Sequence, residues 1–236
     1  MKLYLFLVLV LAQTACIETS IPKNDLSRYG YHGPVKQIVS YKYANYTGIL
    51  DSANFNVRTV FDYNENGNVH FMQLVINRSM MNQESSGINF IYRIRDGKKT
   101  GWQEINLNTL DTSYGTIEWT DSTHIFERKY RSDNQVAYEI ITELDPKTLG
   151  EKVAVVKQYT NGTLIDEKKI ENVLKDGEPY QHLHTLRITG LQDTVMRDTV
   201  FIEILRRDSL NNATQFIEQH GSGGSKTFIR KDFFYY

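Results

Sequence analysis

The 236-residue chain has few cysteines and few prolines, with one cysteine and four prolines. A lone cysteine, Cys16, excludes an internal disulfide and a metal site built from several thiolates. Neither sign of charge is in excess, because the chain has 27 Lys and Arg and 28 Asp and Glu. This balance gives no basic footprint, so no nucleic-acid partner is expected. The apolar run from Leu3 to Ala12 is too short to span a membrane as a helix.

Sequence motifs of catalysis are missing as well. Gly221 to Ser225 is rich in glycine but lacks the Lys-Ser/Thr and helix of a phosphate loop, so it is interpreted as a flexible turn. There is no Gly-x-Ser-x-Gly elbow and no His-Glu-x-x-His pair. We therefore predict a protein that is not an enzyme, with no catalytic residues and no cofactor.

The composition is that of an ordinary folded chain, with 40% hydrophobic and 23% charged residues. Aromatic residues make up 12%, including 15 Tyr and 11 Phe. Aromatic side chains fit a pleated, half-buried surface, so this composition favours β-structure.

The first residues have the order of an export signal. Lys2 precedes the apolar run, and Gln13-Thr14-Ala15 leads into Cys16. A cysteine directly after a small residue at this point resembles the lipobox of bacterial lipoproteins. The resemblance implies a signal peptide at residues 1–15, lipidation of Cys16 with fatty acyl chains such as palmitate, and an anchor in the cell outer membrane. The alternative is a plain secretory signal that leaves Cys16 as a free thiol.

Residues 16–30 follow as the lipidated cysteine and a polar tether, and residues 31–236 are predicted to form a single all-β domain. A boundary between two domains near Gly177 to His182 is the alternative.

Runs of alternating hydrophobicity predict an antiparallel meander of hairpins, a curled sheet that is either barrel-like or a sandwich. The predicted strands are Val35 to Tyr43, Val57 to Tyr63, Val69 to Ile76, Ile88 to Arg95, Thr116 to Trp119, His124 to Tyr130, Val136 to Leu144, Val153 to Tyr159, Leu164 to Val173, His184 to Ile188, Thr199 to Arg206, Ala213 to Glu218 and Lys226 to Phe234.

Turn residues separate these runs. Asn66-Gly67, Asp96-Gly97, Asn161-Gly162 and Asp176-Gly177 are predicted to supply positive φ angles. The segment from Asn77 to Gly87 is expected to be a long loop or a short helix.

The first strong turn carries a family resemblance. Tyr63-Asn64-Glu65-Asn66-Gly67-Asn68-Val69 resembles the core of Rhs-type YD repeats, and Tyr130 to Val136 is a weaker copy with Asn134 in place of Gly. Gly33 to Ile38 is similar to the opening strand of uncharacterised envelope lipoproteins. The resemblance implies stacked hairpins and nothing about catalysis.

Some residues have patterns that bear on binding. His182 and His184 are two apart, which on a strand places both rings on one face, although a solvated pair is favoured over a metal site. The carboxylates Glu104, Glu118, Glu127 and Glu143 are interpreted as a solvated sheet face, and the aromatic residues Trp102, Trp119, Tyr114 and Tyr92 as core. A membrane-spanning barrel, suggested by Phe233 to Tyr236, is disfavoured by charges such as Arg93 and Lys168 within strands.

The leading functional hypothesis is a non-enzymatic, lipid-anchored envelope domain that binds a protein, a glycan or an apolar ligand. The alternatives are an envelope hydrolase with an unrecognised carboxylate pair and a curled-sheet lipid carrier. Asp-Ser and Asp-Thr triplets also resemble the O-glycosylation sequon of some envelope bacteria. The candidate sites are Ser52, Ser122, Thr194, Thr199 and Ser209.

Overall fold

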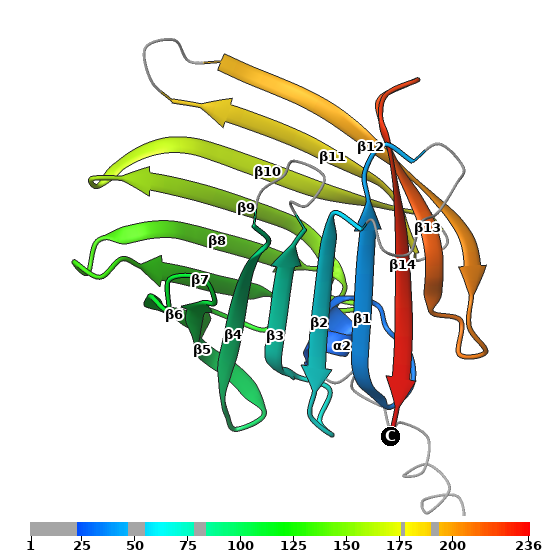
Figure 1. Cartoon of the computed structure of the whole chain (residues 1–236), viewed down its shortest axis with the longest axis horizontal. Coiled ribbons are helices and arrows are strands. Elements are labelled where there is room, and N and C mark those ends of the chain that lie inside the picture. Colours follow the sequence, from blue (N-terminus) through cyan, green and yellow to red (C-terminus); the bar gives the residue numbers. More distant parts are fainter. Residues whose placement is uncertain (1–22, 47–54, 78–83, 176–177, 190–193) are drawn as a thin grey trace, which may run out of the picture.

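The computed structural model describes residues 23–46, 55–77, 84–175, 178–189 and 194–236. Each strand pairs antiparallel with its sequence neighbours, and β14 pairs with β1 to close a 14-strand barrel (Figure 1). The elements are α2 (Asp25–Arg28), β1 (Val35–Tyr43), β2 (Val57–Tyr63), β3 (Val69–Ile76), β4 (Ser86–Arg95), β5 (Lys98–Asn106), β6 (Thr112–Trp119), β7 (His124–Tyr130), β8 (Val136–Leu144), β9 (Glu151–Thr160), β10 (Thr163–Lys175), β11 (Glu178–Ile188), β12 (Thr194–Arg207), β13 (Ala213–His220) and β14 (Lys226–Tyr235). The predicted all-β meander is confirmed, and of the two shapes left open the barrel is formed.

Every predicted strand lies within an observed one, but β5 was missed. It begins Lys98-Lys99-Thr100-Gly101, and these residues are typical of a loop. Two buried contacts account for the strand, because Lys99 pairs with Asp25 and Trp102 belongs to the core. Both are long-range contacts that no local pattern shows.

The turn predictions are confirmed where the structure describes the residues. Asp96, Gly97, Asn161 and Gly162 all have positive φ, and Asn134 takes the left-handed conformation at φ 64°. At Asn66-Gly67 the glycine alone is left-handed, at φ 77°. Residues 176–177 and 78–83 lie outside the described residues, so the Asp176-Gly177 turn and most of the Asn77 to Gly87 segment stay predictions.

The short helix α2 lies inside one end of the barrel, behind β1 and β2 in Figure 1. Its Leu26 packs on a buried cluster of β1, β2 and β3, whereas Arg28 reaches Glu127 on β7 and Glu151 on β9. Contacts with opposite sides of the barrel place the helix in its interior. We call this end, which includes the turns at residues 64–68, 96–97 and 208–212, the plugged end, and the opposite end the far end.

The prediction of a tether over residues 16–30 is therefore wrong for its last part. From Asn24 the segment is folded, because the Asn24 side chain accepts a hydrogen bond from the Ser27 amide and caps α2. A single helical turn is too short to show a period, and its polar residues find partners on distant strands.

Contacts of α2 also identify the inner face of the sheet. Glu127 faces α2, and in the register Glu127 lies opposite Ile117 on β6 and Ile140 on β8. Because side chains alternate between the two faces of a strand, the pairings carry this assignment around the barrel. Two of the buried clusters lie at the plugged end, one around Ile38 and Tyr63 and one around Trp102 and Leu144.

Gly67 provides a first test of this packing. A Cβ there would lie 2.6 Å from Nδ2 of Asn24 and 3.0 Å from Cδ1 of Leu26, so Gly67→Ala adds a clash with α2 to the cost of a positive φ. We expect chemical denaturation to show a loss of more than about 1 kcal/mol. Gly97→Ala is the control, because Gly97 has φ 73° and nothing within 4 Å of the added Cβ. Equal losses in the two variants would contradict the contact between Gly67 and α2.

Candidate functional site in the barrel interior

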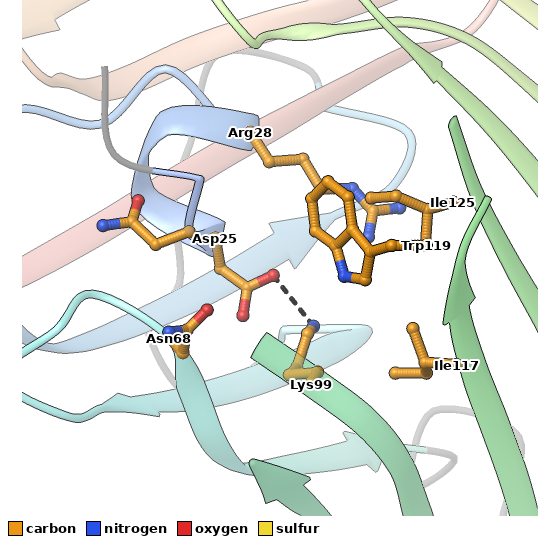
Figure 2. A pocket seen from close by; sticks show the side chains of 8 residues that line it. Asp25, Arg28, Asn68, Lys99, Ile117, Trp119 and Ile125 are labelled. Carbon is orange, nitrogen blue, oxygen red and sulfur yellow. Dashed lines mark ion pairs between the residues drawn. The ribbon is translucent and has the colours of Figure 1, made fainter. Parts of the chain in front are cut away.

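An ion pair joins α2 to the barrel wall. The Asp25 carboxylate lies 2.8 Å from Nζ of Lys99 on β5 and accepts a 2.8 Å hydrogen bond from the Val69 amide on β3 (Figure 2). Asp25 is 3% exposed and Lys99 9%. A buried charge is tolerated when it is paired and hydrogen-bonded in this way.

Arg28 makes a second set of ionic contacts. Its guanidinium lies 3.2 Å from carboxylate oxygens of both Glu127 and Glu151, and it donates a 3.2 Å hydrogen bond to Oγ1 of Thr142. One side chain of α2 thereby holds three strands, β7, β8 and β9. Both carboxylates are engaged by the same cation, which is an arrangement for fixing α2 in place.

A small cavity remains beside these groups. Its volume is about 10 Å³, which is room for about one water molecule. The lining residues are Asn24, Asp25, Arg28, Asn68, Lys99, Ile117, Trp119 and Ile125. The plugged end is thus packed, and this cavity is too small for an organic ligand.

The inner wall of β2, β3 and β4 is apolar from the buried clusters of the plugged end, against which Phe61, Met72 and Phe90 pack, to Leu74 and Ile88. Phe61 lies opposite Met72, which lies opposite Phe90, and Leu74 lies opposite Ile88. All five side chains are half-buried although they point into the barrel. Roughly eight strands make a barrel that its own side chains fill, and this one has 14. The half-buried apolar wall leaves accessible apolar surface on the inner face of the sheet.

The inner wall of β10 to β13 has ionisable groups instead. His182 and His184 lie on one face of β11, as predicted, and that face is the inner one. Their rings are stacked, with centroids 6.2 Å apart. Nδ1 of His182 hydrogen-bonds Oδ1 of Asn172. On the next strands, Nδ1 of His220 lies 2.5 Å from Oδ2 of Asp198, and this hydrogen bond lowers the pKa of the Asp198 carboxyl. In the part of the chain that the structure describes, no cluster of His, Cys, Asp or Glu is arranged to hold a metal ion.

These histidines should make stability depend on pH. Burial lowers the pKa of His182 and of His184, with Lys168 adding to the effect at His184. The charged groups facing the pair are Lys42, Glu151, Lys168, Asp198, Glu218 and His220.

The unfolded chain therefore binds more protons once the pH falls below the free-histidine pKa of about 6.5, and stability falls as the pH drops from there. We expect His182→Gln to reduce the loss of unfolding free energy between about pH 7 and pH 5. His70→Gln, at an exposed position, is the control. A loss that is identical in wild type and His182→Gln would contradict this assignment.

The prediction of a solvated carboxylate face is wrong for two of the four residues. Glu104 and Glu127 face the interior, where Glu104 lies 2.7 Å from Nζ of Lys129 and Glu127 binds Arg28. Glu118 is exposed and Glu143 pairs with the exposed Lys152. An alternating pattern gives the two faces of a strand but not the partners that make an inward charge tolerable.

The core interpretation of the aromatic residues holds in part. Trp102 is buried, and Tyr92 and Trp119 pack against buried clusters. Tyr114, on the outer face, is 57% exposed. Its strand β6 has an inner row of Gly115, Ile117 and Trp119, which leaves Tyr114 on the water side.

The candidate glycosylation sites differ in exposure. Ser122, Thr194 and Ser209 are exposed, Thr199 is half-buried within β12, and Ser52 lies outside the described residues. The turn-forming role of the aspartates is evident, because Asp121 accepts hydrogen bonds from the Thr123 and His124 amides and Asp208 from those of Leu210 and Asn212. The Thr123 amide is the main group that lowers the pKa of Asp121, to about 2. Glycosylation stays a prediction.

Sequence reasoning missed the groups that hold α2. Asp25 and Arg28 lie in the expected tether and Lys99 in the missed strand. The one local signal is Asn24 followed by Asp25, a capping residue and an acid at a helix start.

Comparison of the chain with family models, with curated proteins and with solved structures finds no match. Among the described residues, no helix is both long enough and apolar enough to cross a membrane.

Proposed function

We propose that this chain is a lipid-anchored cell-envelope domain, not an enzyme, whose barrel interior binds a small amphipathic molecule. The observation that carries the proposal is the half-buried apolar inner wall of β2 to β4. Apolar side chains that face an interior and still have accessible surface are typical of ligand sites.

The two chemistries of the inner wall suit a ligand with two parts. An acyl or other hydrocarbon portion would lie against Leu74, Ile88 and Phe90, while the ionisable groups of β10 to β13 would face its polar portion. At the far end, the inner-face residues Ile188 and Met196 are 41% and 48% exposed. Their positions suit an apolar entrance. Because α2 fills the plugged end, a ligand would enter the interior through the far end.

Ion pairs on the outer face of the barrel are what a domain surrounded by water would have. Arg128 lies 2.8 Å from Glu139, and Lys157 lies 3.8 Å from Glu167, on neighbouring strands of that face. The membrane attachment in this proposal comes from Cys16, whose acyl chains exceed what stable anchoring needs.

The test is a titration with Nile red, an uncharged probe whose fluorescence rises in an apolar site. Ile88→Lys places a charge on the inner wall, and Ile91→Lys makes the same change on the outer face of the same strand, where Ile91 is 44% exposed. We expect saturable binding to wild type and Ile91→Lys and none to Ile88→Lys, with all three folded by circular dichroism. Equal binding to both variants, or no binding to wild type, would reject the interior site.

Anchoring has its own prediction. Cys16→Ser removes the one thiol of the chain, so the protein should lose fatty acids and leave the membrane fraction completely. Metabolic labelling with a fatty-acid analogue, followed by fractionation, measures both effects. Wild-type protein that stays unlabelled would refute lipidation.

A further inference from the structure

The plugged end carries several exposed apolar side chains. Leu205 and Leu210, at the end of β12 and in the following turn, are 46% and 41% exposed, and Phe234 and Tyr236 are 50% and 56% exposed. Leu210 lies over Gly33, where a Cβ would be 2.5 Å from its Cδ1 and 3.5 Å from Tyr235.

Tyr236 and the turn that contains Leu210 and Asn212 are held in place by hydrogen bonds. Tyr236 donates hydrogen bonds from its amide to the Pro34 carbonyl (3.0 Å) and from its hydroxyl to the Tyr63 carbonyl (2.7 Å). Asn212 donates from Nδ2 to the Tyr235 hydroxyl at 2.9 Å and to the His32 carbonyl. A fixed surface of this kind loses little conformational entropy when it binds.

The anchor proposed at Cys16 would bring a bilayer close to this surface. Lys23, the first described residue, is at the plugged end beside α2, and Cys16 precedes it by seven residues. Seven extended residues reach at most about 25 Å. A bilayer that holds the Cys16 thiol is therefore within reach of the plugged end.

Charge at this end matches the same partner. Among the described residues, its exposed charged side chains are Lys23, Lys36, Arg95, Lys98, Lys147, Lys152 and Arg206 on the basic side and Glu65, Asp96, Glu118 and Asp121 on the acidic side. Basic residues near an anionic membrane are attracted to it, and tyrosine is enriched where one end of its ring is apolar and the other wet.

We propose that the plugged end rests on the surface of an anionic phospholipid bilayer, with Leu210 and Tyr236 at the interface and the far end directed away from it. The entrance to the interior then faces the aqueous side. This orientation rests on the proposed anchor at Cys16 and is independent of whether the interior binds a ligand.

The experiment uses Cys16 as a unique coupling point. The mature chain is attached through this thiol to a maleimide lipid in vesicles of phosphatidylethanolamine and phosphatidylglycerol, so cellular lipidation is not required. Hydroxyl-radical footprinting then compares attached and free protein. We expect oxidation of Leu210 and Tyr236 to fall on attachment, relative to Leu110, which is 73% exposed at the far end.

A matched pair of variants separates the bilayer contact from mere proximity. Leu210→Asp should restore oxidation of Tyr236 in the attached protein, whereas Leu110→Asp should leave its protection unchanged. Oxidation that is unaltered by attachment at Leu210 and Tyr236, or protection of Leu110 instead, would overturn the proposal. Circular dichroism verifies that both variants are folded.

Discussion

Replacing Arg28 with alanine should lower the free energy of unfolding by about 3–5 kcal/mol, because Glu127 and Glu151 would then be left in the interior without their cation. The Arg28 side chain is 10% exposed, so water screens these contacts little. Chemical denaturation followed by circular dichroism measures the loss.

Lys152→Ala is the control for the Arg28 substitution. Lys152 forms an ion pair of similar length with Glu143, but the two side chains are 52% and 38% exposed, so its removal should change stability little. The variant Arg28→Met with Glu127→Gln and Glu151→Gln should regain part of the loss, since no unpaired charge remains. Equal effects of Arg28→Ala and Lys152→Ala would show that α2 is not held by a buried ionic contact.

Gly115→Ala should cost about 1–3 kcal/mol, because a Cβ at this position would lie 2.1 Å from Cζ2 of Trp102. The indole ring is 3% exposed and stacks on Tyr138 with centroids 6.3 Å apart, so it has little room to move. The same denaturation measurement applies.

Gly150→Ala is the matched control, since its Cβ would approach only the Thr148 hydroxyl, at 3.3 Å. Trp102→Phe should be less harmful in the Gly115→Ala background than in wild type, because it removes part of the ring that clashes. Additive losses would contradict the direct contact between Gly115 and Trp102.

The fold was largely predictable because strands and turns have local signals. The alternation of apolar and polar residues in β4 or β12 indicates a strand, and Asn161-Gly162 specifies a left-handed turn without any long-range information. Closure was not predictable, because it depends on the pairing of β1 with β14, which are far apart in the chain. Sheet curvature and stagger decide that pairing.

The interior was predictable only in part. The spacing of His182 and His184 places them on one face whatever the fold, and the structure confirms it. Which face of a strand lies inside depends on how the sheet closes into a barrel. The sequence does not show this, so Glu104 and Glu127 were assigned to a solvated face. Asp25 and Lys99 are 74 positions apart in sequence, so no local sequence pattern indicates that they form an ion pair.

Native mass spectrometry of the Cys16→Ser protein, exported by its cell and purified without detergent, is the most direct measurement of the central claim, that the barrel interior binds a small amphipathic molecule. The account predicts that this protein has a larger mass when folded than when denatured, by the mass of a molecule released on unfolding. It also predicts that adding Ile91→Lys retains this difference and that adding Ile88→Lys abolishes it. Equal masses of the folded and denatured Cys16→Ser protein, with no uptake of an added long-chain amphiphile, would contradict the claim.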